Sequence, residues 1–110
     1  MMDFTVDFSE KDSYYLIKVE GEIDAYHSAT FKQKVKEKFA EPKFTKFVID
    51  MSAVSYIDSA GLGAVVSLLK EARNLNKELV LAGLQSQVRK IFEMTKLDKI
   101  VKIVDTVEEA

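Results

Sequence analysis

The sequence predicts a single α/β domain over residues 1–110, with a mostly parallel sheet, an N-terminal antiparallel hairpin and three to four helices. The chain has 110 residues, of which 47% are hydrophobic, and this suits one domain with a substantial core. Two segments of alternating apolar and polar residues come first. Helical periodicity and short apolar runs then follow one another to the end of the chain, which is the pattern of βαβ units in a parallel sheet.

The predicted hairpin occupies the first part of the chain. Phe4, Val6 and Phe8 alternate with polar residues, and the apolar residues at 15, 17 and 19 do the same. Alternation of this kind predicts half-buried strands. The polar stretch EKDS at 10–13 forms the turn between them. We expect the second strand to extend into GEID at 21–24 and the first strand to be the antiparallel member of the sheet.

A helix is predicted after the hairpin. Phe31, Val35 and Phe39 recur every four residues among lysine, glutamine and glutamate, and the only proline of the chain follows soon after. Asp24 or Ser28 supplies the N-cap oxygen of this helix in our interpretation, because aspartate and serine are favoured caps.

The remaining elements alternate in type. KFVIDM at 46–51 and ELVLAG at 78–83 are apolar runs that predict strands buried on both faces. A helix over 60–74 and another near 88–95 follow them, and KIVKIV at 99–104 predicts a last strand before the short polar tail DTVEEA. The first of these two helices has an apolar stripe formed by Gly61, Ala64, Val65, Leu68, Leu69 and Ala72.

Composition disfavours several classes of function. The 16 basic and 18 acidic residues give a net charge of -2, whereas nucleic-acid binding calls for a basic face. The chain has no cysteine and a single histidine, His27, so any metal site would depend on carboxylates. No signal peptide is visible, and the least polar run is about half of the ~20 residues that a membrane helix needs. We expect a cytoplasmic protein with no metal, no cofactor, no direct nucleic-acid partner and no membrane partner.

The stretch YIDSAGLGAV at 56–65 places a small hydroxyl, Ser59, between a predicted strand and a predicted helix. One interpretation is that Ser59 simply caps the helix. A second is a phosphate-binding loop, since helix N-termini attract anions. However, the third glycine of G-x-G-x-x-G is replaced by Val66, and Asp58 places a negative charge where a phosphate would lie.

A nucleophilic serine is a third interpretation. The corresponding strand-turn-helix motif is G-x-S-x-G, but the residue two before Ser59 is Ile57. His27 is the only candidate base, and no acid stands in a fixed relation to it that would orient it. We therefore predict no catalytic residue and no enzyme activity.

The interpretation we favour is covalent modification of Ser59. Ala60 and Gly61 have almost no side chain to cover the hydroxyl, so a kinase could reach it. A phosphate adds roughly -1.5 to -2 charges. The helix N-terminus favours that charge by about 0.3–1 kcal/mol, and Asp58 opposes it, so the fold should tolerate the modification.

The same residues resemble a known family. YIDSAGLG at 56–63 is similar to the signature of the STAS domain, the fold of bacterial anti-sigma factor antagonists. GEID at 21–24 and FVIDMSAV at 47–54 resemble two further motifs of that family, and the order of elements agrees over about residues 4 to 108. The resemblance implies a single STAS domain that regulates transcription by switching between partners.

The resemblance also implies the roles of particular residues. In that family an unphosphorylated antagonist binds an anti-sigma factor that is also a serine kinase, which releases the sigma factor. The kinase then phosphorylates the signature serine, and a serine phosphatase resets the protein. On this basis Ser59 is the phosphoacceptor, and Asp58 and Asp24 are the acidic residues near it.

We expect the partner to contact the residues around this serine. The expected binding residues are Asp24, Tyr56, Asp58, Ser59, Ala60, Gly61 and Leu62. Ile57 is expected to point inward. Leu62 and Val66 lie off the main helical stripe and form either a second buried edge or an exposed apolar strip. Two alternatives stay open: a STAS subunit of a stress-signalling or lipid-transport complex, and a small nucleotide-binding protein.

Overall fold

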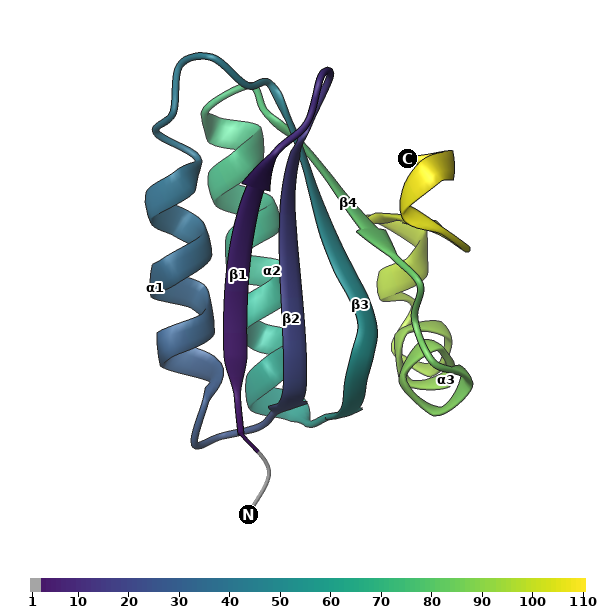
Figure 1. Cartoon of the computed structure of the whole chain (residues 1–110). Helices are drawn as coiled ribbons and strands as arrows, with labels where there is room; N and C mark the ends of the chain where they lie inside the picture. Colours follow the sequence, from purple (N-terminus) through teal and green to yellow (C-terminus); the bar gives the residue numbers. More distant parts are fainter. Residues whose placement is uncertain (1–2) are drawn as a thin grey trace.

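The computed structural model describes residues 3–110, which form one sheet with helices packed against it (Figure 1). The strands are β1 (Thr5–Glu10), β2 (Tyr15–Ile23), β3 (Lys46–Ile57), β4 (Glu78–Ala82) and β5 (Lys102–Val104). The helices are α1 (Ser28–Lys38), α2 (Ser59–Asn74) and α3 (Ser86–Met94), with short 3-10 helices η1 (Leu97–Lys99) and η2 (Val107–Glu109). The predicted α/β class and the element order are confirmed.

The strands lie in the sheet in chain order, β1-β2-β3-β4-β5. β1 is antiparallel to β2, with Val6 opposite Val19, and the other neighbouring pairs are parallel. Crossovers between parallel strands are almost always right-handed, so three crossovers in the same direction place their helices on the same face. The buried side chains of α1, α2 and α3 do belong to one hydrophobic cluster, and α1 and α2 lie side by side in Figure 1.

The interior strands are buried on both faces where the sequence predicts it. Phe47, Ile49 and Met51 of β3 belong to the main core beneath the helices. Val48 faces the other side of the sheet, where a smaller cluster includes Val107 next to the chain end. Continuous apolar runs are therefore explained by two separate cores, one on each side of the sheet.

Three predicted boundaries were wrong. β3 does not end at residue 51 but continues to Ile57. Met51, Val54 and Ile57 are buried at a spacing of three, because register shifts in the pairing with β2 interrupt the usual alternation. β5 begins at Lys102, and residues 97–99 form η1 instead of strand. The helix predicted near 88–95 is α3, which begins at Ser86 and ends at Met94, with Thr95 as its C-cap.

Helix α2 is the element that the sequence predicts most fully. Its buried residues are the six of the predicted stripe: Gly61, Ala64, Val65, Leu68, Leu69 and Ala72. The helix begins at residue 59, one residue earlier than predicted, and ends at 74 as predicted. This stripe fixes the orientation of the helix, and with it the direction in which its first residues point.

Candidate interaction site at Ser59

The site lies where β2 and β3 end side by side. Ile23 and Ile57, the last residues of the two strands, are paired in the parallel register, and the backbone N–H of Asp58 donates to the carbonyl of Ile23. The turn before α1 and the start of α2 therefore meet at the carboxyl edge of the sheet. Binding sites in parallel sheets usually gather at this edge.

Asp58, and not Ser59, is the N-cap of α2. Its Oδ1 accepts a hydrogen bond from the N–H of Gly61 at 2.9 Å, as an N-cap side chain should. Its Oδ2 accepts from the N–H of Ala25 at 2.9 Å, in the turn before α1. One carboxylate thus caps the helix and joins the two loops of the site, which corrects the interpretation of Ser59 as the cap.

Ser59 is the first residue of α2 and is exposed. Its side-chain oxygen makes no hydrogen bond to any residue in the described range 3–110. Because Asp58 already caps the helix, the hydroxyl of Ser59 is not needed for the fold.

The small residues after Ser59 have two different roles. Ala60 is half-buried at the surface of the site. Gly61 is buried, and a Cβ there would collide with the carbonyl oxygen of Ile23 and lie 2.7 Å from Ile57 Cγ1. We therefore remove Gly61 from the expected contact surface, because its absent side chain lets α2 approach β2.

Asp24 orders the turn before α1. Its Oδ1 accepts from the N–H of His27 at 3.0 Å, and it lies 3.0 Å from His27 Nδ1. The helix N-cap is His27, which makes no capping side-chain bond, so the prediction that Asp24 or Ser28 caps α1 was wrong. Asp24 and Asp58 nevertheless lie on the two loops that meet beside Ser59.

His27 is half-buried and packed against its neighbours. The ring stacks on Phe4, with centroids 4.6 Å apart and planes 9° from parallel, and Nδ1 lies 3.1 Å from the carbonyl oxygen of Glu22. Packing and backbone contacts thus account for the histidine. It holds the turn against the start of β1.

Two tyrosines present apolar area on this end of the molecule. Tyr56 is 47% exposed at the end of β3, as predicted, while Ile57 beside it is buried as predicted. Tyr26 is 86% exposed and packs edge-on against His27. Tyrosines are enriched at binding hot spots. Tyr26 was not among the predicted contact residues, although its position two residues after GEID could have indicated it.

A shallow groove lies between α1 and α2 next to Ser59. It has a volume of about 220 Å³ and is lined by Ser28, Ala29, Lys32, Ala60, Gly63 and Ala64. Leu62 is half-buried and packs against the core, and Val66 is also half-buried, so these two do not form an exposed apolar strip. The surface around Ser59 therefore combines small residues, tyrosine and ordered carboxylates.

The fold and this surface define a small α/β module with an accessible serine at a helix start. The chain belongs to the STAS domain family, whose pattern matches residues 5–110. It is 37% identical over 103 residues to the anti-sigma-B factor antagonist of Listeria monocytogenes, covering 93% of this chain and 90% of that protein. The anti-sigma-B factor antagonist of Staphylococcus aureus is 28% identical over 102 residues, covering 93% of this chain and 94% of its own.

Solved structures agree on the fold. The anti-sigma factor antagonist from Mycobacterium paratuberculosis superimposes with a TM-score of 0.87 at 22% identity, covering 97% of this chain and 90% of its own. The phosphorylated form of Bacillus SpoIIAA gives a TM-score of 0.71 at 20% identity, covering 97% of this chain and 95% of its own. The resemblance seen in the sequence is confirmed at the level of family and fold.

Two features are absent from residues 3–110. None of their helices has the length and apolar character needed to cross a bilayer. Their histidine and acidic side chains form no group of three that could hold a metal ion.

Proposed function

We propose that this chain is an anti-sigma factor antagonist controlled by phosphorylation of Ser59. The unphosphorylated protein binds an anti-sigma factor that is also a serine kinase, and this releases the sigma factor. The kinase transfers the γ-phosphoryl group of ATP to Ser59 Oγ, which loses its proton as ADP leaves. The modified protein dissociates, and a serine phosphatase hydrolyses the phosphoester. In this proposal the chain is a single regulatory domain of the cytoplasm with no catalysis of its own.

The observation that carries the proposal is that Asp58, and not Ser59, caps helix α2. Asp58 supplies the cap of α2, and Ser59 keeps an exposed, unbonded hydroxyl one residue later. The hydroxyl of Ser59 takes no part in capping, so its phosphorylation leaves the hydrogen bond between Gly61 N–H and Asp58 in place.

Electrostatics favours a switch in binding over a switch in folding. The phosphate adds roughly -1.5 to -2 charges at a helix N-terminus, which stabilises negative charge by about 0.3–1 kcal/mol. The carboxylate of Asp58 opposes this by a similar amount. In a fitted interface the same group meets a surface shaped for a hydroxyl, and such a mismatch costs about 2–5 kcal/mol.

The proposed contact surface surrounds the serine. Tyr26 and Tyr56 supply the large exposed side chains, and Ala60 and the groove beside it supply a close-fitting surface. Asp24 and Asp58 make the rim acidic and thereby suit a basic patch on the kinase. Leu62 supports this surface from beneath, because it packs against the core.

The family relatives support this assignment in preference to the alternatives. Two relatives that this chain matches over most of their length are named anti-sigma-B factor antagonists. The nucleotide-binding alternative has no comparable support, because the Asp58 carboxylate already accepts from the N–H of Gly61 at the start of α2, where a phosphate would bind.

The test uses the purified chain, its cognate anti-sigma factor kinase and ATP. We expect mass spectrometry to find one phosphate on the wild-type protein, at Ser59, and none on Ser59→Ala. Ser67→Ala is the matched control, since Ser67 is an exposed serine two turns further along the same helix. Phosphate at Ser67, or at any residue other than Ser59, would refute the proposed acceptor.

A further inference from the structure

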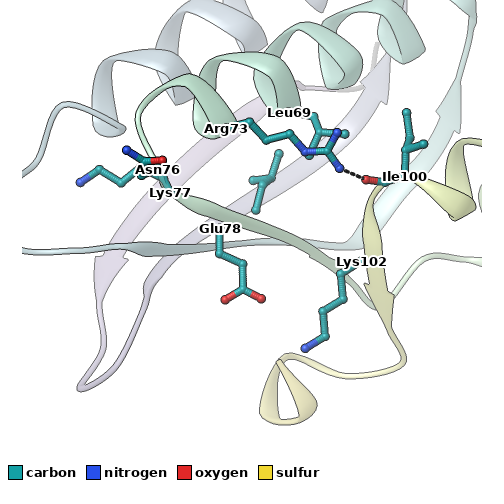
Figure 2. A pocket seen from close by; sticks show the side chains of 8 residues that line it. Leu69, Arg73, Asn76, Lys77, Glu78, Ile100 and Lys102 are labelled. Carbon is teal, nitrogen blue, oxygen red and sulfur yellow. Dashed lines mark hydrogen bonds between the residues drawn. The ribbon is translucent and has the colours of Figure 1, made fainter.

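A second concave surface lies far from Ser59, where the strands begin. It is a groove of about 480 Å³ between the end of α2, the start of β4 and the segment before β5 (Figure 2). Its lining residues are Leu69, Arg73, Asn76, Lys77, Glu78, Leu79, Ile100 and Lys102. This volume is within the range of small-molecule sites, about 300–1,000 Å³.

The groove has apolar walls. Leu69 and Leu79 belong to the main core and present their edges to the groove, while Ile100 is 43% exposed. Ile100 is one of the few large apolar side chains that the described part of the chain leaves exposed. A ligand with an apolar body would remove this surface from water.

Arg73 is held in place at this groove. Its Nη2 donates to the carbonyl oxygen of Ile100 at 2.6 Å, which links the end of α2 to the segment before β5, as Figure 2 shows. Within residues 3–110 no carboxylate lies within ion-pair distance of Arg73. The guanidinium therefore keeps its charge and its other N–H groups available, in a fixed position, and a fork of such donors matches a carboxylate.

The other charged residues of the groove are arranged differently. Lys77 donates to the carbonyl oxygens of Glu41 and Phe44, so its ammonium is committed to the loop before β3. Lys102 and Glu78 project to the side of β4 opposite Arg73 in Figure 2. The side of the groove with Arg73 has the amide of Asn76 and no acidic lining residue.

We propose that this groove binds a small organic anion that joins a carboxylate to an apolar chain. The carboxylate pairs with the guanidinium of Arg73, and the chain lies against Ile100 and the edges of Leu69 and Leu79. The inference does not depend on the proposed function, because Ser59 and Arg73 are at opposite ends of α2. They are separated by 14 residues of helix, or about 21 Å at 1.5 Å per residue.

The test is a titration of the isotope-labelled full chain followed by amide NMR shifts. The probe is hexanoate, with acetate as the anion lacking the chain and hexylammonium as the chain with the opposite charge. We expect hexanoate to give saturable shifts at Arg73, Asn76, Leu79 and Ile100. Acetate should bind there at least about tenfold more weakly, and hexylammonium should not bind there.

Two variants test the assigned contacts. Arg73→Gln should weaken hexanoate binding about tenfold, and Ile100→Asn should weaken it about threefold. Lys90→Gln is the control, because it removes an exposed cation from α3 that does not line the groove. The proposal is overturned if wild-type shifts are absent or spread over the surface, or if Lys90→Gln weakens binding as much as Arg73→Gln.

Discussion

The two ends of α2 present opposite kinds of surface. At its start, the side chain of Asp58 accepts hydrogen bonds from two backbone N–H groups, and the exposed groups nearby include the hydroxyl of Ser59 and two tyrosines. A groove of about 220 Å³ lies beside them, between α1 and α2. At its end, Arg73 makes no ion pair within residues 3–110 and lies in a groove of about 480 Å³ whose wall is partly apolar. The first surface suits a protein partner, and the second suits a small anion.

The difference follows from the geometry of a parallel sheet. Where β2 and β3 end, short loops lead into α1 and α2, so backbone N–H groups without partners in a helix lie close together. Asp58 accepts hydrogen bonds from two of them. At the opposite edge, β5 pairs with only the last three residues of β4, so the start of β4 lies open beside the end of α2. The same helix therefore has a smaller groove beside its start and a larger one beside its end.

The largest effect on stability is expected from a substitution of Gly61, near the start of α2. Gly61→Ala should lower the free energy of unfolding by about 3 kcal/mol, because its Cβ collides with the backbone of Ile23. Gly63→Ala, two residues on, is the control. Nothing lies within 4 Å of a Cβ at Gly63, so it should raise stability by about 0.5–1 kcal/mol. Urea unfolding measures both; equal effects would break the assignment of Gly61 to packing.

Ser59→Glu should separate binding from folding. We expect about 100-fold weaker affinity for the kinase partner, since a charge enters the fitted surface. The free energy of unfolding should change by less than about 0.5 kcal/mol, because Ser59 makes no bond to lose. Calorimetric titration and urea unfolding measure the two quantities. A large loss of stability would mean that the serine supports the fold after all.

Variants of Asp58 test whether this residue, unlike Ser59, stabilises the fold. Asp58→Ala should cost about 2 kcal/mol of unfolding free energy, since it removes the helix cap and the link to Ala25 together. Asp58→Asn retains a good capping oxygen and should cost less than half as much. If the two variants unfold at the same urea concentration, the charge and not the cap explains the role of Asp58.

A variant of Tyr26 tests whether this side chain belongs to the interaction surface. Tyr26→Ala should weaken the kinase complex about tenfold and leave stability within about 0.5 kcal/mol, because the ring is largely exposed in the free chain. Tyr14→Ala, at the far end of the hairpin next to the start of β2, serves as the comparison for binding. Equal affinities of the Tyr26 variant and the wild type would remove Tyr26 from the surface.

The smallest effect is expected when a residue at the end of α2 is changed and binding at the start of the helix is measured. Arg73→Gln should change the affinity for the kinase partner by less than about 0.5 kcal/mol, and its effect should add to that of Tyr26→Ala. The physical reason is the separation of the two surfaces by the whole helix. Surface plasmon resonance on the four proteins of this double-mutant cycle measures the coupling, and a coupling above about 1 kcal/mol would mean that the two ends are linked.

Local pattern was enough to predict much of the fold. The stripe of α2 and the alternation in the hairpin follow from the period of hydrophobic residues, and both are confirmed. The extension of β3 was missed because its outer residues are polar and its end carries the family signature. In the site, the exposure of Ser59 and the inward direction of Ile57 were predicted from neighbouring residues alone.

Contacts between distant segments could not be predicted from local pattern. Asp58 was a candidate contact residue, but its bond to Ala25 depends on the pairing of β2 with β3. The second groove depends on Arg73 meeting Ile100, 27 positions away and from an element of different type. Such features depend on strand order, which the sequence alone leaves open.

The most direct test of the central claim uses the phosphoserine itself. The kinase partner is titrated with the unphosphorylated chain and with the chain phosphorylated at Ser59, and the thermal unfolding of both forms is recorded. We expect about 100-fold weaker binding of the phosphorylated form, with unfolding curves that coincide. Equal affinity of the two forms, or a phosphorylated chain that has lost its fold, would contradict it.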